Sequence, residues 1–111
     1  MTAKEFFEGI ENFTDNVYNV YRTNTFKKNV ELYYRRGSDL KLLYDVIHTI
    51  AKGEELNPKH VAHTLTNFPA PIKGLSVWEC HVKPDWLLVW QQDGKELILM
   101  LIATGTHSDL F

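Results

Sequence analysis

The sequence predicts one α+β domain, in which amphipathic helices occupy the first half of the chain and a meander of strands occupies the second. The length of 111 residues is close to the usual size of a single domain, and the composition, 44% hydrophobic and 23% charged, is typical of a globular protein. No apolar run is long enough to span a bilayer, and no secretory signal is visible. The single cysteine excludes an internal disulfide and fits a cytoplasmic location.

The first predicted helix is short and acidic. Phe6 and Ile10 recur at helical spacing within residues 4–13, and the acidic residues of this segment point elsewhere. Residues 1–15 contain one lysine and four acids. We therefore expect an acidic N-terminal extension over residues 1–15, followed by a single domain over residues 16–111.

Two longer helices are predicted next, and they should form a hairpin. The first follows the capping segment 23–25 and ends at Gly37, and the second follows the cap Ser38-Asp39 and ends at Gly53. Both segments place apolar residues at i, i+3 and i+4. A single glycine turn between them favours close packing of the two helices.

Strands are predicted where polar and apolar residues alternate or where β-branched and aromatic residues gather, at residues 16–22, 61–65, 77–83, 86–91 and 96–104. Asp93-Gly94 between the last two is a hairpin signal. The apolar run from Leu97 to Ile102 does not alternate, which predicts an interior strand that is covered on both faces. The resulting sheet should be small and antiparallel.

The predicted strand at residues 77–83 carries the most chemistry. Its core face presents three apolar side chains, those of Trp78, Cys80 and Val82. Its exposed face presents a carboxylate, an imidazole and an ammonium group, from Glu79, His81 and Lys83. Proton transfer between histidines and carboxylates is therefore the chemistry that this region favours.

Two other kinds of site compete with that interpretation, a zinc site and a nucleophilic cysteine. Zinc ligands of suitable type occur at His60, His63, Cys80 and His81. However, Cys80 and His81 are adjacent in a strand and point to opposite faces, so both cannot bind one ion. A nucleophilic Cys80 is the second alternative, but its inward orientation favours an inert, buried thiol. The net charge of −2 also argues against tight binding of bare nucleic acid.

Three segments resemble one known family. They are KHVAHTL at residues 59–65, ECHVKPDWLL at residues 79–88 and TGTHSDLF at residues 104–111. Together they are similar to the YafQ branch of the RelE superfamily of toxins, and the similarity spans roughly residues 18–111. The resemblance implies a RelE-like fold, in which two helices pack on a small antiparallel sheet. The short acidic helix predicted from the periodicity of residues 4–13 precedes the matched region and is additional to that fold.

The resemblance also implies a function, the toxin of a type II toxin–antitoxin system that cleaves mRNA on the ribosome without a metal or cofactor. In that chemistry the ribose 2′-OH attacks the adjacent phosphorus and leaves a cyclic phosphate and a 5′-OH. The implied partners are a cognate antitoxin and the ribosome with its mRNA. Operator DNA would be contacted only through the antitoxin.

The family's functional positions fall on particular residues of this chain. The implied catalytic residues are His63, His81, Asp85 and His107. The family's C-terminal aromatic falls on Phe111, and Glu79 stands where some members have aspartate; we expect both to bind substrate, Phe111 by stacking on a base. Lys83 is a further substrate-binding candidate, as a base of this chain that compensates for missing arginines.

The chain departs from the family at positions that are often basic. Ala103 stands where many relatives have arginine, and Ser76-Val77-Trp78 replaces a Tyr-Arg pair beside a two-residue insertion. These departures leave an alternative open, in which the chain is a catalytically weak module that acts through antitoxin binding and transcriptional autoregulation.

Overall fold

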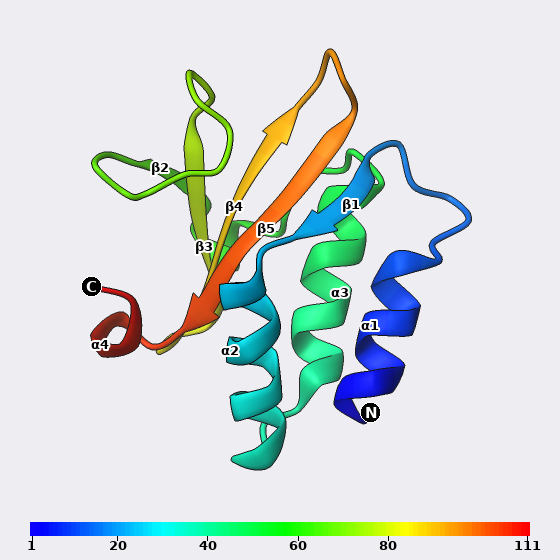
Figure 1. Cartoon of the computed structure of the whole chain (residues 1–111), viewed down its shortest axis with the longest axis vertical. Coiled ribbons are helices and arrows are strands. Elements are labelled where there is room, and N and C mark those ends of the chain that lie inside the picture. The colour runs from blue at the N-terminus through cyan, green and yellow to red at the C-terminus, as the bar shows by residue number, and fades with distance from the viewer.

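The computed structural model describes residues 1–111, which form a five-stranded sheet with three helices on one face (Figure 1). The helices on that face are α1 (Ala3–Glu11), α2 (Asn24–Arg35) and α3 (Leu40–Ala51). The strands are β1 (Asn19–Arg22), β2 (His63–Leu65), β3 (Val77–Lys83), β4 (Trp86–Asp93) and β5 (Ile98–Gly105). A 3₁₀ helix, η1 (Pro58–His60), precedes β2, and a short helix, α4 (His107–Leu110), follows β5. None of the helices combines the length and apolar character needed to cross a membrane.

The predicted α2–α3 hairpin is confirmed, together with the residues predicted to begin and end its helices. The Thr23 hydroxyl accepts a hydrogen bond from the Phe26 N–H, and the Asp39 carboxylate accepts one from the Lys41 N–H. These side chains bind backbone donors that the first turn of a helix leaves free. Gly37 has a φ of +80°, a left-handed conformation that glycine adopts without steric strain.

The sheet has the strand order β1-β5-β4-β3-β2, and one pair of strands differs from the antiparallel prediction. β1 runs parallel to β5, with Val20 opposite Leu99. The two strands are far apart in sequence, so no tight turn constrains their relative direction. The other pairs are antiparallel, as predicted.

Strand β5 lies inside the sheet, as its continuous apolar run predicts. It pairs with β1 on one side and with β4 on the other. Leu99 and Leu101 pack into the core under the helices, whereas Ile102 and Ala103 pack on the opposite face.

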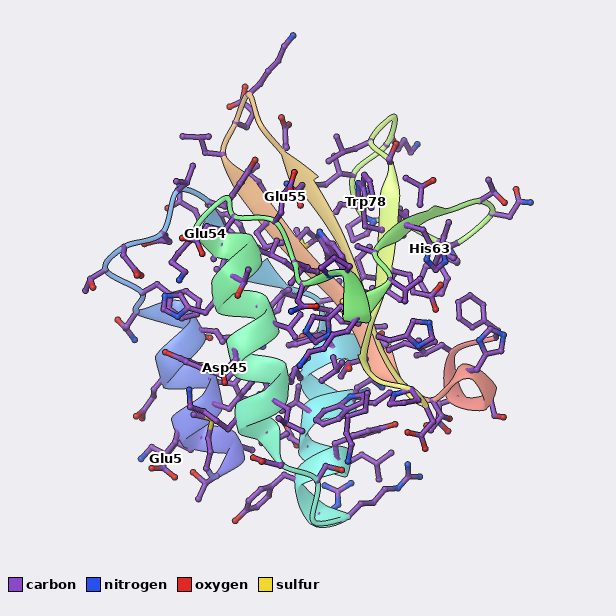
Figure 2. All side chains as sticks on the ribbon, turned by 180° about the vertical axis from the view of Figure 1, so that it is seen from behind. Glu5, Asp45, Glu54, Glu55, His63 and Trp78 are labelled. Carbon is purple, nitrogen blue, oxygen red and sulfur yellow. The ribbon has the colours of Figure 1, made fainter.

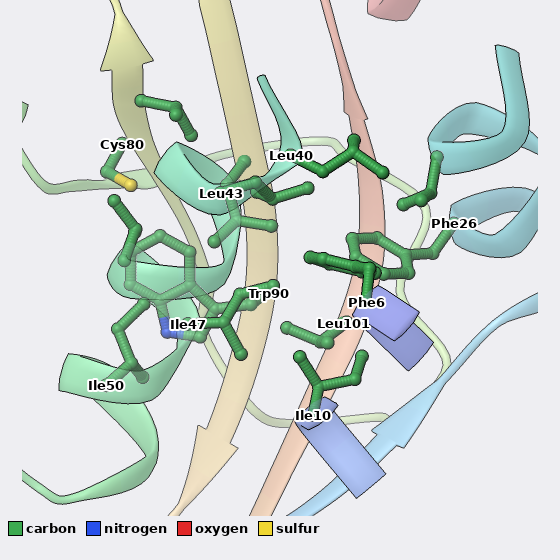
Figure 3. Close-up of a cluster of buried hydrophobic side chains, with 14 of the residues drawn as sticks. Phe6, Ile10, Phe26, Leu40, Leu43, Ile47, Ile50, Cys80, Trp90 and Leu101 are labelled. Carbon is green, nitrogen blue, oxygen red and sulfur yellow. The ribbon is translucent and has the colours of Figure 1, made fainter. Parts of the chain in front are cut away.

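The main hydrophobic core lies between the helices and the sheet (Figure 3). Its 18 buried residues include Phe6 and Ile10 of α1, which are 0% and 1% exposed. Phe6 lies beside Phe26, with ring centroids 6.3 Å apart. The acidic helix therefore contributes its apolar face to the same core as the rest of the chain.

The connection after α1 is attached to α3 through His48. The imidazole stacks on Phe13 with ring centroids 4.4 Å apart, and its Nε2 lies 2.8 Å from the Asp15 carboxylate. The hydrogen bond to His48 lowers the pKa of Asp15. His48 is half-exposed, because it lies on α3 beside the apolar residues that face the core.

The sheet face opposite the three helices carries no long helix, and we call it the site face. A smaller cluster of four buried residues lies on it, formed by Val77, Val89, Ile102 and Ala103. Side chains from the loop after β2, including Phe68 and Ala70, pack over this cluster.

Candidate active site

Strand pairing brings most of the histidines named by the resemblance to the site face. His63 of β2 is the pairing partner of Glu79 on β3. Two residue pairs further along β3, His81 pairs with Leu87, which in turn pairs with Gly105 at the end of β5. Residues that pair directly across an antiparallel sheet project from the same face. His63 and His81 therefore lie in neighbouring rows of one face, and Figure 2 shows His63 beside β2, on the opposite side of the view from Glu5 of α1.

Glu79 forms an ion pair with His63. The Nε2 atom of His63 lies 3.2 Å from Oε2 of Glu79. Glu79 is only 4% exposed, which corrects the prediction that it lies on an open face. The reason is that β2 covers this part of β3, although the sequence of β2 gives only a weak strand signal. Glu79 is placed to hold His63 rather than to meet a substrate.

The contacts of His63 fix the orientation of its ring. Its Nδ1–H donates to the carbonyl oxygen of Val61 at 3.0 Å, because a carbonyl can only accept. Its Nε2 atom faces the Glu79 carboxylate, which accepts a hydrogen bond when Nε2 carries a proton. The two contacts hold the ring from both of its nitrogen atoms. Val61 has a φ of +49°, a strained conformation for a β-branched residue. Its carbonyl oxygen is the one that accepts the hydrogen bond from His63.

His81 has the complementary arrangement. Its Nδ1–H donates to the carbonyl oxygen of Pro84 at 3.1 Å. No carboxylate lies within 4.0 Å of the ring, and its Nε2 has no hydrogen-bond partner. A neutral imidazole in this tautomer presents a free lone pair at Nε2, which is the requirement for a general base.

Lys83 is the last residue of β3, Asp85 lies in the tight turn that follows it, and both are exposed. They line a hollow of about 290 Å³ together with Tyr33 of α2. No histidine lies within ion-pairing distance of Asp85, so the structure does not form the Asp85–histidine cluster that the sequence suggests. A register shift between His81 and Lys83 breaks the alternation of β3 and places Lys83 toward the helix side of this turn.

Helix α4 places His107 and Phe111 at one side of the site face (Figure 1). Thr106 and Asp109 form a capping box at its start, and the hydrogen bond from the Thr106 backbone lowers the pKa of Asp109. The helix packs tightly on Gly105, where a Cβ atom would lie 3.2 Å from the Cβ of Asp109. A larger residue at position 105 would therefore displace the segment that carries His107.

The rings of His107, Phe111 and Phe68 form one aromatic cluster. The centroid of Phe111 lies 4.7 Å from that of His107 and 5.5 Å from that of Phe68. Phe111 is 55% exposed, so much of its surface is open to a ligand. The contribution of Phe68 depends on the fold of the loop after β2, and no sequence signal pointed to it.

Ala103 and Trp78 stand at positions that are often basic in relatives, and they lie on opposite faces of the sheet. Ala103 is 2% exposed and lies in the apolar cluster of the site face, under the loop that carries Phe68. Trp78 instead packs on Trp90 toward the helix-covered core, with ring centroids 6.4 Å apart. Neither position supplies a cation to the site.

The structure also bears on the two alternative kinds of site. Cys80 is fully buried, and burial raises the pKa of its thiol to about 12, with a further contribution from the nearby Glu79 carboxylate. A thiol in this environment is protonated and inert, as its inward orientation predicts. Nowhere in residues 1–111 do three His, Cys, Asp or Glu side chains lie close enough together to hold a metal ion.

His60 has a contact that the sequence does not reveal. Its Nδ1–H donates to the backbone carbonyl of His81 at 2.6 Å and so links η1 to the outer edge of β3. The two residues are 21 positions apart, and only the folded loop brings them together.

Comparison with known proteins gives the same family from the sequence and from the structure. Residues 18–111 match the family described as bacterial toxin of type II toxin–antitoxin system, YafQ. A metal-bound toxin from Helicobacter pylori is 37% identical, with a TM-score of 0.73 over 83% of this chain and 97% of that one. YafQ in the E. coli DinJ–YafQ toxin–antitoxin complex is 25% identical, with a TM-score of 0.73 over 86% of this chain and 98% of that one. YafQ from E. coli strain BL21(DE3) is 25% identical, with a TM-score of 0.71 over 85% and 98% of the two chains. No curated protein sequence matches significantly.

Proposed function

The chain belongs to the YafQ family of toxins of type II toxin–antitoxin systems, and from that membership we propose that it is a ribosome-dependent mRNA endoribonuclease that uses acid–base catalysis without a metal. The observation that supports this most directly is the pair of histidines on the site face. His81 presents a free Nε2 atom, whereas Nε2 of His63 lies against the Glu79 carboxylate, which favours a cation there. RNA cleavage by internal attack needs both a proton acceptor and positive charge near the phosphorus.

The proposed reaction assigns one role to each histidine. Nε2 of His81 accepts the proton of the ribose 2′-OH, and the 2′ oxygen forms a bond to the adjacent phosphorus. The bond from phosphorus to the 5′ oxygen breaks, and His107 donates a proton to that leaving oxygen. The His63 imidazolium stabilises the negative charge on the phosphorane. The products are a 2′,3′-cyclic phosphate and a 5′-hydroxyl, so atoms and protons balance.

The proposed partners follow from the family and from the charge of the chain. The E. coli relative has been crystallised with its antitoxin DinJ, which supports a cognate antitoxin for this chain. Contact with operator DNA would occur through that antitoxin. A net charge of −2 favours a substrate that another particle presents, so we place the reaction on ribosomes in the cytoplasm.

Phe111 is proposed to stack on an mRNA base. A base–aromatic stack contributes about 1–3 kcal/mol, so Phe111→Ala should lower single-turnover cleavage on ribosomes by roughly 5- to 150-fold. Phe111→Trp should retain most of the activity, whereas Phe111→Leu should resemble the alanine variant because it lacks an aromatic face. Melting temperatures measured alongside separate this role from packing on Phe68. If the leucine variant is as active as the wild type, Phe111 is a packing residue.

The proposed function is tested with purified protein and ribosomes programmed with a defined mRNA. We expect the wild type to cut that mRNA. The cut position, mapped from the ends of the fragments, should lie in the decoding region of the ribosome. The same mRNA without ribosomes should stay intact under matched conditions. Rapid cutting of naked RNA would contradict ribosome dependence, and the absence of cutting in both reactions would favour the alternative of a catalytically weak module.

A further inference from the structure

A groove of about 650 Å³ lies along the outer edge of β3, beside the candidate active site. Strand β2 pairs with β3 only as far as Glu79, so no strand covers the edge from Cys80 onward. The groove is bounded by η1, by the end of β3 and by the first turn of α3. Of its lining residues, His60, His81 and Lys83 are candidate site residues from the sequence, and the proposed reaction uses only His81.

His60 holds the two walls of this groove together. Its hydrogen bond to the backbone carbonyl of His81 replaces the strand pairing that β2 does not supply at this point. The ring therefore fixes η1 against the part of β3 that carries the proposed general base. The groove and the site face meet at His81, which lines the groove and belongs to both.

The sides of the groove are cationic. Lys59 on one wall and Lys83 on the other are both exposed, and neither has a carboxylate within 4.0 Å. No acidic residue lines the groove. The nearest acid on α3, Asp45, is already paired with Lys41. An acidic protein thus keeps two unpaired ammonium groups on opposite walls of one concave surface.

The floor of the groove is apolar. Leu42 and Val61 are 37% and 56% exposed, so both give aliphatic surface to the groove. Surfaces that bind single-stranded nucleic acid combine a positively charged groove along the backbone with aromatic side chains on which bases stack. The groove has the first of these features, and its aliphatic floor suits contact with the sugars of a backbone rather than stacking of bases.

We propose that this groove binds the phosphodiester backbone of the single-stranded RNA that flanks the cut site, with Lys59 and Lys83 contacting phosphates. The inference rests on the proposed function, because it places a strand that leaves the groove directly at His81. It also identifies a source of the positive charge that Ala103 and Trp78 do not supply. An acidic peptide is the competing occupant, and the experiment below distinguishes it.

The test measures binding apart from cleavage. A fluorescein-labelled RNA decamer with 2′-O-methyl groups throughout resists internal attack, so its anisotropy reports affinity alone. The variants are Lys59→Gln, Lys83→Gln and the double variant. Lys95→Gln is the matched control, because Lys95 is also exposed and without an ion pair but lies in the turn between β4 and β5, at the other end of the sheet.

Each phosphate contact contributes about 0.7 to the slope of log K against log salt for single strands. We expect the double variant to lose about 1.4 units of that slope and to bind the decamer on the order of 10- to 100-fold more weakly at low salt. The control should match the wild type. Equal binding by the wild type and the double variant would overturn the proposal, as would tight binding of an oligoglutamate peptide with no binding of the decamer.

Cleavage on programmed ribosomes separates this proposal from the proposed function. If the wild type cuts mRNA and the double variant shows a raised KM with an unchanged kcat, both proposals are supported. If the wild type cuts and the double variant has the same KM, the groove is not a substrate site although the nuclease assignment stands. If the wild type does not cut, the nuclease assignment fails, and the decamer assay alone decides whether the groove binds RNA.

Discussion

Replacing His81 by asparagine should lower the single-turnover rate of mRNA cleavage on ribosomes by about 10²- to 10⁴-fold, the usual contribution of a general base. Asparagine keeps an N–H donor for the Pro84 carbonyl but has no basic nitrogen in place of Nε2. The fold should therefore persist while the proton acceptor is lost. Quenched-flow measurement of fragment formation, at saturating protein, isolates this step from binding.

His48→Ala is the matched control for this substitution. His48 is also half-exposed, but it lies on α3 and contacts Phe13 and Asp15, far from the site face. Its replacement should leave the cleavage rate unchanged, although the melting temperature is expected to fall slightly. If His81→Asn retains more than about a tenth of the wild-type rate, the assignment of the base is wrong.

The second large effect concerns stability. Phe6→Ala should lower the free energy of unfolding by about 3–5 kcal/mol, because the ring is fully buried and its removal leaves a cavity in the main core. This loss is a large fraction of the stability of a typical small domain. Urea denaturation followed by tryptophan fluorescence measures it, since Trp86 and Trp90 lie in the same core.

The neighbouring Phe7 provides the comparison. It is only half-buried and lies under the Arg22 guanidinium at 4.7 Å, so Phe7→Ala should cost clearly less than Phe6→Ala. Residues 1–17 lie outside the region that matches the family, and this pair of variants measures how far α1 is part of the cooperative fold. A cost below about 1 kcal/mol for Phe6→Ala would show that α1 unfolds independently of the domain.

Local sequence signals predicted most of the fold, for physical reasons that the structure makes clear. Thr23 and Asp39 cap helices because their side chains satisfy backbone donors nearby in the chain, and Gly37 ends a helix through its own backbone conformation. These effects need no distant partner. The direction of β1 was missed because it depends on contact with β5, from the far end of the chain.

The candidate site was predictable as a set of residues but not as an arrangement. The resemblance named His63 and His81, but only the pairing of β2 with β3 shows that Glu79 is buried beside His63. The tautomers of the two rings depend on the carbonyls of Val61 and Pro84, which carry no side-chain signal. The same holds for His60, whose partner is a backbone atom.

In the proposed reaction the 2′-OH of the mRNA is the attacking nucleophile, and this chain supplies the acid and the base. Programmed ribosomes that carry mRNA with a single 2′-deoxynucleotide on the 5′ side of the mapped cut test this step. We expect the wild type to leave this position uncut, while the all-ribose mRNA yields fragments with a 2′,3′-cyclic phosphate and a 5′-hydroxyl. Cleavage of the deoxy-substituted mRNA at the same position would show that the 2′-OH is not the nucleophile.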